Sequence, residues 1–383
     1  MPIHFTPEEF AGRRERTCAA LRRAGLDGLL MFRQESMYYL TGYDSFGYCF
    51  FQCLVLTADG RFVLLTRAPD LRQARHTSVI ENIRIWVDGA GHNPAHDLEA
   101  LLRELGLAGT RLGIEYDAYG LTAYSWRQME SVLPDFCRLE DASRLVDRQR
   151  MVKSPAEMVY VQRAAELADR ALEAGLAVAA PGVDEAGILA AMQAAVLAGG
   201  GDYPGNEFII GSGRDALLCR YHSGRRRLDA RDQLTLEFAG VYRRYHAALM
   251  RTVPIGAAAP EHIHMHAVAI DALEACMAAL RPGEPLGAVF DAHARVVDAA
   301  GYRHARLNAC GYSMGAVYAP SWMDWPMLYT GNGVLAEPGM VLFLHMILMD
   351  SERGYAMTPG QTVRVTERGC ESLHRVSMEM TVR

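Results

Sequence analysis

The chain has 383 residues, of which 50% are apolar, and a formal net charge of -6 at pH 7. Charged residues form no acidic or basic block, no apolar run reaches the roughly 20 residues of a membrane span, and the N-terminus carries no secretion signal, so we expect a cytoplasmic protein with neither nucleic-acid nor membrane partners. The eight cysteines are scattered and Lys153 is the single lysine, which argues against a disulfide framework, a zinc ribbon, a lysine-containing phosphate loop and a pyridoxal-phosphate enzyme.

The first part of the chain alternates helix and strand signals. Thr6-Pro-Glu-Glu-Phe10 is typical of a helix start, with an N-cap residue followed by proline at the first helical position. We expect helices at about 6–24, 37–40, 70–76, 97–105 and 121–132, and strands at about 28–32, 49–57, 61–66, 84–87 and 111–115. This alternation predicts a three-layer α/β domain over residues 1–145.

A polar segment at about 144–153 separates this domain from the rest of the chain. Ser154-Pro155, with Glu157 three residues after the serine, forms a helix start of the capping-box type. We therefore place the domain boundary between 145 and 146 and expect a second domain over 146–383. Its predicted elements are helices at about 156–180, 184–197, 264–280 and 286–300, a hairpin at 232–252, and closing strands at about 340–349 and 362–366.

The hairpin at 232–252 is the segment around which the second domain is organised, and we expect its turn at Gly240. Glu237 lies within the apolar run of its first strand. An ionised carboxylate there costs several kcal/mol unless it is paired, hydrogen-bonded or bound by a ligand. One interpretation is a functional carboxylate, and the other is an ion pair with a neighbouring arginine such as Arg243, Arg244 or Arg251.

Five spaced motifs cover nearly the whole chain. They are Lys153-Ser-Pro-Ala-Glu157, the hairpin at 232–252, Gly311-Tyr-Ser-Met-Gly315, Pro338-Gly-Met-Val341 and Thr362-Val-Arg-Val-Thr-Glu-Arg-Gly369. In order and spacing they resemble the pita-bread superfamily of methionine aminopeptidase, prolidase, aminopeptidase P and creatinase. This resemblance implies a C-terminal α+β pita-bread domain, of the creatinase/aminopeptidase type, after the N-terminal α/β domain.

The resemblance does not extend to the metal ligands of the peptidases, which hold two ions with two Asp, one His and two Glu. The matching positions here are Glu237, Ala248, Tyr312, His345 and Gly360. One carboxylate and one imidazole do not provide the donors of a two-metal centre, so we expect a protein without metal or other cofactor. The alternative is a displaced single-metal site formed by His222, His246 and His345.

Metal-free members of the superfamily offer two comparisons. Creatinase binds a guanidinium with two glutamates, whose positions match Met250 and His345, so creatine is a poor substrate here. The stretch Leu236-Glu-Phe-Ala-Gly-Val-Tyr-Arg-Arg-Tyr-His246 and the motif Trp322-Met-Asp-Trp325 resemble the ectoine hydrolases. That resemblance implies opening of a small cyclic amidine, ectoine or 5-hydroxyectoine, to an N-acetyl-diaminobutyrate in compatible-solute catabolism.

Such a reaction needs an attack on the amidine carbon, a proton for the leaving amine and a negative charge facing the cation. We assign the charge to Glu237, which also acts as nucleophile or as the base for water, and consider His222 and His345 as further catalytic groups. Strict spacing in the resemblance selects Arg220 in place of His222. Candidate substrate-binding residues are Arg220 for a carboxylate, Tyr245, His246 and Tyr312 for polar contacts, and Trp322 and Trp325 as an aromatic wall.

In creatinase a loop of the partner's N-terminal domain reaches the site. The matching loop here, 46–51, contains Tyr48 and Phe50, so the resemblance implies a homodimer in which these two residues approach the partner's substrate. Three rival functions stay open: an Xaa-Pro dipeptidase-type metallopeptidase with a rearranged metal site, a creatinase-like amidinohydrolase, and a non-catalytic peptide-binding protein.

Overall fold

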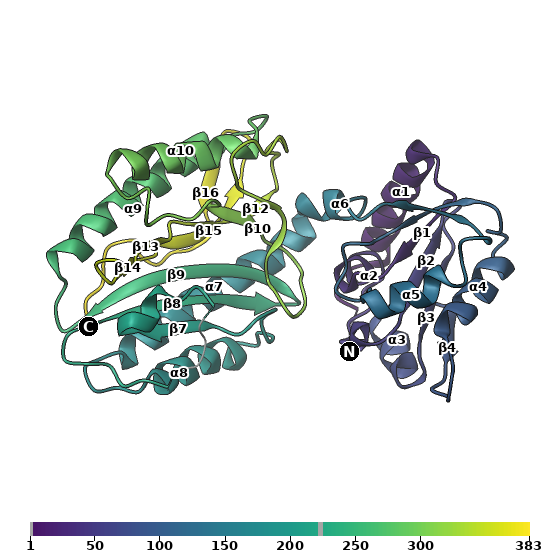
Figure 1. Cartoon of the computed structure of the whole chain (residues 1–383), viewed down its shortest axis with the longest axis horizontal. Coiled ribbons are helices and arrows are strands. Elements are labelled where there is room, and N and C mark those ends of the chain that lie inside the picture. The colour runs from purple at the N-terminus through teal and green to yellow at the C-terminus, as the bar shows by residue number, and fades with distance from the viewer. Residues whose placement is uncertain (1–2, 221–224) are drawn as a thin grey trace. The chain divides into compact units, whose positions relative to one another are not determined.

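The structure is a computed structural model that describes residues 3–220 and 225–383. It divides into two compact units, Met1–Arg150 and Met151–Arg383 (Figure 1). The division lies a few residues after the boundary predicted between 145 and 146. Within the described ranges, no helix combines the length and apolar character needed to cross a membrane.

A six-stranded sheet runs through the first unit in the order β4-β3-β2-β1-β5-β6. Strands β1, β2 and β3 pair antiparallel, whereas β3 with β4, β1 with β5 and β5 with β6 pair in parallel. The strands are β1 (Gly28–Met31), β2 (Cys53–Thr57), β3 (Phe62–Arg67), β4 (Ile83–Trp86), β5 (Arg111–Ile114) and β6 (Arg138–Asp141).

Helices cover both faces of this sheet. Successive side chains of a strand point to opposite sides, and the apolar side chains on each side pack against helices. Leu29 and Met31 of β1 pack in one core with Leu21 of α1 and Leu40 of α2, and Leu30 packs in the other core with α4 and α5. The three-layer α/β prediction is confirmed. The helices are α1 (Pro7–Ala24), α2 (Gln34–Thr41), η1 (Gly47–Cys49), η2 (Ala68–Asp70), α3 (Leu71–Thr77), α4 (Pro94–Glu104) and α5 (Ala123–Glu130).

The second unit contains an eight-stranded antiparallel sheet in the order β11-β10-β12-β15-β9-β8-β7, with β16 also paired to β15. Its long central hairpin is formed by β8 and β9 (Figure 1). The strands are β7 (Ile209–Ser212), β8 (Asp232–Tyr242), β9 (Tyr245–Ile255), β10 (Gly311–Ser313), β11 (Asp324–Met327), β12 (Val341–His345), β15 (Gly360–Val365) and β16 (Cys370–Ser372), with β13 (Leu348–Asp350) and β14 (Tyr355–Met357) as a separate pair.

The long helix α7 begins at the predicted capping box. The Ser154 hydroxyl accepts from the backbone N–H of Glu157 at 3.3 Å, and the Glu157 carboxylate accepts from the backbone N–H of Ser154 at 2.9 Å. Helix α7 packs against β8 and β9, while α9 and α10 share a core with β12 and β15. The helices are α6 (Asp147–Met151), α7 (Pro155–Val178), α8 (Glu185–Ala198), η3 (Gly213–Leu217), α9 (Pro260–Ala279) and α10 (Leu286–Ala299).

The turn of the central hairpin does not lie at Gly240, so that prediction is wrong. Strand β8 continues to Tyr242, and the turn is formed by Arg243 and Arg244, whose φ angles of 52° and 68° give the doubly left-handed turn that suits the twist of a hairpin. Gly240 is required for a different reason. A Cβ atom there would lie 2.0 Å from the carbonyl oxygen of Ala164, so glycine permits the close approach of α7 to β8.

Several short strands were not predicted from the sequence. Strands β10, β14 and β16 have three residues each, too few to show an alternating pattern. The closing strand predicted at 340–349 is interrupted, because β12 ends at His345 and β13 begins at Leu348.

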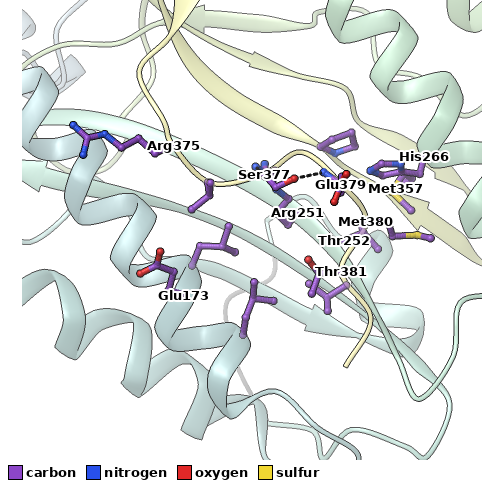
Figure 2. Close-up of a pocket in the computed structure, with 15 residues that line it drawn as sticks. Glu173, Arg251, Thr252, His266, Met357, Arg375, Ser377, Glu379, Met380 and Thr381 are labelled. Atoms are coloured by element: carbon purple, nitrogen blue, oxygen red, sulfur yellow. Dashed lines mark hydrogen bonds between the residues drawn. The ribbon is translucent and has the colours of Figure 1, made fainter.

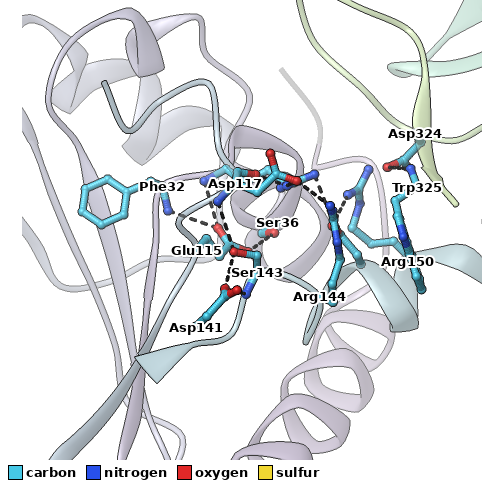
Figure 3. Close-up of polar contacts among 12 residues, drawn as sticks. Phe32, Ser36, Glu115, Asp117, Asp141, Ser143, Arg144, Arg150, Asp324 and Trp325 are labelled. Carbon is cyan, nitrogen blue, oxygen red and sulfur yellow. Dashed lines mark hydrogen bonds and ion pairs between the residues drawn. The ribbon is translucent and has the colours of Figure 1, made fainter. Parts of the chain in front are cut away.

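A buried carboxyl group stabilises the start of α2 in the first unit. Helix α2 has no capping side chain of its own, and Glu115, which follows β5, accepts hydrogen bonds from the backbone N–H groups of Phe32 and Arg33 at 3.1 and 2.9 Å and from the Ser36 hydroxyl (Figure 3). Burial raises the pKa of Glu115 to about 7, although the charge of Arg33 opposes this. The folded unit therefore binds a proton at Glu115 at pH values where the unfolded chain has lost it.

We predict that the free energy of unfolding decreases as the pH rises from about 4.5 to about 7, because the folded state must release this proton across that window. In Glu115→Gln the acceptor oxygen remains and the titration disappears, so the decrease should shrink by at most about 3 kcal/mol. Urea unfolding of the full chain at a series of pH values measures this. Glu81→Gln, at an exposed position of the same unit, should behave as the unmodified protein. Identical pH dependence in Glu115→Gln would show that the folded state keeps this carboxyl ionised.

Candidate functional site

Four strands carry a row of residues on one face of the second unit's sheet. Glu237 of β8 is opposite Met250 of β9, Met250 is opposite Gly360 of β15, and Gly360 is opposite His345 of β12. Directly opposed residues of antiparallel strands point to the same face. At Gly360 a Cβ atom would lie 3.0 Å from the ring of Phe343, so the glycine leaves room for that ring. The row brings one carboxylate and one imidazole to the same face.

Tyr312 of β10 contacts Glu237 of β8, although these two strands are not neighbours in the sheet. Three strands lie between β10 and β8 in the strand order, yet the Tyr312 hydroxyl donates to Oε1 of Glu237 at 3.3 Å. The sheet must therefore curl strongly enough to bring these strands together on this face. Trp322 is 1% exposed, and its Nε1–H donates to the Tyr312 hydroxyl at 2.8 Å. A hydrogen-bond chain thus runs from Trp322 through Tyr312 to Glu237.

The electrostatic state of Glu237 follows from its burial. Loss of solvent raises the pKa of Glu237 to about 7, while the Tyr312 hydrogen bond and the charge of Arg220 favour the ionised form. Within residues 3–220 and 225–383, no cation lies at ion-pair distance from Glu237. The interpretation of Glu237 as the partner of a hairpin arginine is not supported, because Arg251 belongs to the opposite face of β9. Glu237 is a buried carboxylate held by one phenol.

His345 is a neutral imidazole. Its ring centroid lies 5.6 Å from that of Tyr312 and 5.5 Å from that of Phe343, and its Nδ1 is buried with no hydrogen-bond partner in the described part of the chain. Burial, assisted by the nearby His293, lowers the pKa of His345 to about 3. An imidazole in this state carries no excess proton at neutral pH. It can accept or donate a hydrogen bond, but it is a poor general acid.

Tyr245 and His246 both have structural partners. The Tyr245 hydroxyl donates to Glu157 of α7 at 2.8 Å, on the face opposite Glu237. His246 lies on the same face as Glu237, but its Nε2 accepts from the backbone N–H of Gly205 at 2.8 Å and its Nδ1 is 2.8 Å from the carbonyl oxygen of Arg244. Burial lowers the pKa of His246 to about 4. The substrate-binding roles predicted for these two residues do not fit these positions.

The two predicted aromatic residues of the 322–325 motif do not form a wall together. Trp322 is enclosed and holds Tyr312, whereas Trp325 packs against the core shared by α9 and α10. The aromatic ring that does lie beside His345 and Tyr312 is Phe343.

The remaining predicted residues are Arg220, His222, Tyr48 and Phe50. Arg220 is exposed, and its charge acts on both Glu237 and Tyr312. His222 lies outside the described residues. Tyr48 and Phe50 belong to the first unit, where Tyr48 is buried and the guanidinium of Arg67 stacks over the exposed ring of Phe50 at 4.4 Å.

The donor set does not fit the two metal ions of the peptidases. The five positions expected to hold them contribute one carboxylate, one imidazole whose Nδ1 is buried, one phenol and two residues without donor side chains, Ala248 and Gly360. Among the residues that the structure describes, no three His, Cys, Asp or Glu side chains are grouped so that they could hold a metal ion.

Sequence reasoning missed Phe343 and the threonines beside Glu237. Phe343 lies two residues before His345, and Thr235 lies two residues before Glu237, so the alternation of a strand places each on the same face as its neighbour. Thr235 and Thr252 have their hydroxyls 3.4 Å apart, and Thr252 and Thr358 have theirs 3.0 Å apart. The period-2 alternation of the strands was the signal that could have identified Phe343 and Thr235.

Comparison with known proteins extends these observations. Residues 160–367 match metallopeptidase family M24, and residues 13–152 match the creatinase/prolidase N-terminal domain. An ectoine hydrolase from Halomonas elongata is 28% identical over 388 residues, which cover 97% of this chain and 96% of that protein.

Solved structures with a similar fold include a prolidase from Thermococcus sibiricus and a dipeptidase from Pyrococcus horikoshii. The first has a TM-score of 0.88 and 18% identity, over 98% of this chain and 99% of that chain. The second has a TM-score of 0.85 and 21% identity, over 97% of this chain and 100% of that chain. The prediction of an α/β N-terminal domain followed by an α+β pita-bread domain is confirmed.

The two histidines on this face should respond differently to replacement by leucine. His246→Leu leaves the buried N–H of Gly205 without its acceptor and removes one of the two donors to the Arg244 carbonyl, so we expect a loss of about 1–3 kcal/mol in the free energy of unfolding. His345→Leu removes an imidazole whose Nδ1 is already unpaired, so the loss should be below about 1 kcal/mol. Urea unfolding measures both, and equal costs would contradict the assignment of His246 as the structural residue.

Proposed function

The chain belongs to metallopeptidase family M24, and from that premise we propose that it is a hydrolase that works without a metal ion and opens a small cyclic amidine. Ectoine and 5-hydroxyectoine are the proposed substrates, and an N-acetyl-diaminobutyrate is the proposed product. The ectoine hydrolase of Halomonas elongata, similar over 97% of this chain, supports this choice of substrate.

The observation that carries the proposal is the state of Glu237. A buried carboxylate that accepts one hydrogen bond, and has no ion-pair partner among the described residues, favours an organic cation as its ligand. The positions around it hold Met250, Gly360 and Ala248, where a two-metal site would need oxygen donors. The same sheet face that holds two metal ions in the peptidases would here hold an amidinium.

In the proposed reaction, Glu237 attacks the carbon between the two amidine nitrogens. A carboxylate oxygen forms a bond to that carbon, and the electron pair of the C=N bond moves to nitrogen. The ring C–N bond then breaks, and the leaving nitrogen takes a proton and departs as an amine. Water next attacks the same carbon, and the C–O bond to Glu237 breaks, which releases the acetamide and restores the carboxylate. If Glu237 instead removes a proton from water, the same bonds of the substrate change without the covalent stage.

The groups around Glu237 have separate tasks in this scheme. Tyr312 keeps its proton, because burial and the neighbouring Glu237 raise its pKa, so it orients the carboxylate as a hydrogen-bond donor. Phe343 and Met250 provide apolar contact for the ring of the substrate. The proton for the leaving amine is assigned to His222, which stays a prediction from the sequence.

Recognition of the substrate carboxylate is assigned to Arg220, whose charge already acts at Glu237. We also propose a homodimer in which the 46–51 loop of each partner covers the other site. Phe46 and Phe50 of this loop are 76% and 46% exposed, which supports a role in contact with a partner.

Incubation with ectoine in the presence of a chelator tests the reaction directly. We expect an acetylated diaminobutyrate by mass spectrometry, formed at the same rate with and without EDTA. Glu237→Gln should keep the melting temperature within a few degrees and lose at least 1,000-fold in kcat, because an amide can neither attack nor balance the cation. The matched control is Glu337→Gln, at an exposed position of the same unit, which should retain activity.

Two results would overturn the proposal. Stoichiometric manganese, zinc or iron in the purified protein, with hydrolysis of Xaa-Pro dipeptides that EDTA abolishes, would establish the rival metallopeptidase. Retention of ectoine hydrolysis in Glu237→Gln would remove Glu237 from the reaction.

The pH dependence of activity should report the pKa of Glu237. Because the reacting form is the carboxylate, kcat/KM should fall about tenfold per pH unit below about pH 7. Tyr312→Phe removes a hydrogen bond that favours the ionised form, so this fall should begin at a higher pH. Steady-state rates of amide formation between pH 5 and pH 9 measure both profiles. A profile of Tyr312→Phe shifted to lower pH would contradict the proposed contact.

A further inference from the structure

A cavity of about 340 Å³ lies on the face of β9 that is directed away from Glu237. Its walls come from α7, β9, α9 and the C-terminal segment that follows β16 (Figure 2). Its lining includes Leu172, Glu173 and Leu176 of α7, Arg251 of β9, and Ser377 and Glu379 of the C-terminal segment. None of them contributes to the Glu237 site.

Arg251 is the charged group of this cavity that is buried, with 8% of its surface exposed. Its guanidinium donates three hydrogen bonds, all to backbone carbonyls: Nη1 to Met250 and Gly360, both at 2.8 Å, and Nη2 to Ser377 at 3.2 Å. A guanidinium has five N–H donors. These contacts leave the Nε–H and one Nη2–H, which belong to adjacent nitrogens of the group.

The charge of Arg251 is not matched by a contacting acid in the described part of the chain. Asp169, whose charge acts on Arg251, is already engaged: one carboxylate oxygen is 2.8 Å from Nδ1 of His374, and the other accepts from the backbone N–H of Arg375 at 2.9 Å. Glu173 and Glu379 line the cavity but are exposed. In Figure 2, Glu173 and Arg375 lie to one side, apart from Arg251. Burial lowers the pKa of Arg251 only to about 10, so it remains a cation at neutral pH.

We infer that this cavity is a binding site for a small organic carboxylate, held by the Nε and Nη2 edge of Arg251. A carboxylate accepts two parallel N–H bonds from one edge of a guanidinium, and this pairing would supply the negative charge that the carbonyl partners do not. The volume of the cavity suits a ligand of a few heavy atoms. Leu172 and Leu176 provide apolar contact for its carbon chain.

The ligand would also be coupled to the Glu237 face. The carbonyls that Arg251 holds belong to Met250 and Gly360, the two residues between Glu237 and His345 in the row across the sheet. A bound carboxylate that draws the guanidinium toward the cavity changes the hydrogen bonds from Arg251 to these two carbonyls. The binding itself does not rest on the proposed function, because it needs no substrate.

Calorimetric titration of the full-length protein tests the inference. Sodium acetate and sodium propionate, each against sodium chloride at constant ionic strength, should give saturable binding of one equivalent that chloride does not give. Sodium phosphate is the second arm, and binding tighter than that of propionate would overturn the assignment of a carboxylate. We expect Arg251→Lys, which keeps the charge and loses the fork, to weaken binding at least tenfold.

Two further variants keep the test decisive if Arg251→Lys is poorly folded. Leu176→Phe fills the cavity without altering Arg251 and should also weaken binding at least tenfold, whereas Arg170→Met, which removes an exposed arginine of the same helix, should leave it unchanged. Binding that survives Leu176→Phe would overturn the site. Glu237→Gln should leave the titration unchanged, so loss of ectoine hydrolysis and loss of carboxylate binding are distinguished.

Discussion

The hydrogen bond between Tyr312 and Glu237 is the contact on which the candidate site depends. It joins β10 and β8, which three other strands separate in the sheet, so it forms only because the sheet curls upon itself. The curl brings an acid from a long central hairpin and a phenol from a three-residue strand to the same place. The Nε1–H of Trp322 donates a hydrogen bond to the Tyr312 hydroxyl and so holds it in position. Without this contact, Glu237 would be a buried charge with no partner among the described residues.

Burial decides the chemistry of the other polar groups as well. His345 and His246 are both held neutral, but only His246 uses both nitrogens within the fold. Glu115 in the first unit has a raised pKa like Glu237, yet it accepts three hydrogen bonds and stabilises a helix start. A raised pKa alone therefore does not identify a functional carboxylate. The number and kind of hydrogen-bond partners distinguish Glu237 from the structural carboxyl group of Glu115.

Much of the architecture was predictable because its signals are local. The capping box at Ser154 and the alternation of apolar residues defined α7 and the long strands, and the spaced motifs led to the pita-bread fold. The importance of Glu237 followed from a charge within an apolar run. The turn was misplaced because Gly240 has a packing role that only the position of α7 reveals. The role of His246 was equally hidden, since its partner Gly205 lies in a loop more than 40 residues earlier.

Successive residues of β9 serve opposite sides of the sheet. Met250 belongs to the face of Glu237, and Arg251, the next residue, belongs to the cavity under α7. One peptide unit thus separates two chemically different environments. A strand of this kind accepts exchanges of side chains but not a change in its length, because inserting or deleting a single residue before Met250 would turn the arginine toward Glu237 and the methionine toward the helix. A one-residue change in the length of β9 would therefore exchange the two chemistries, whereas a change in the length of a loop outside the hairpin would leave both in place.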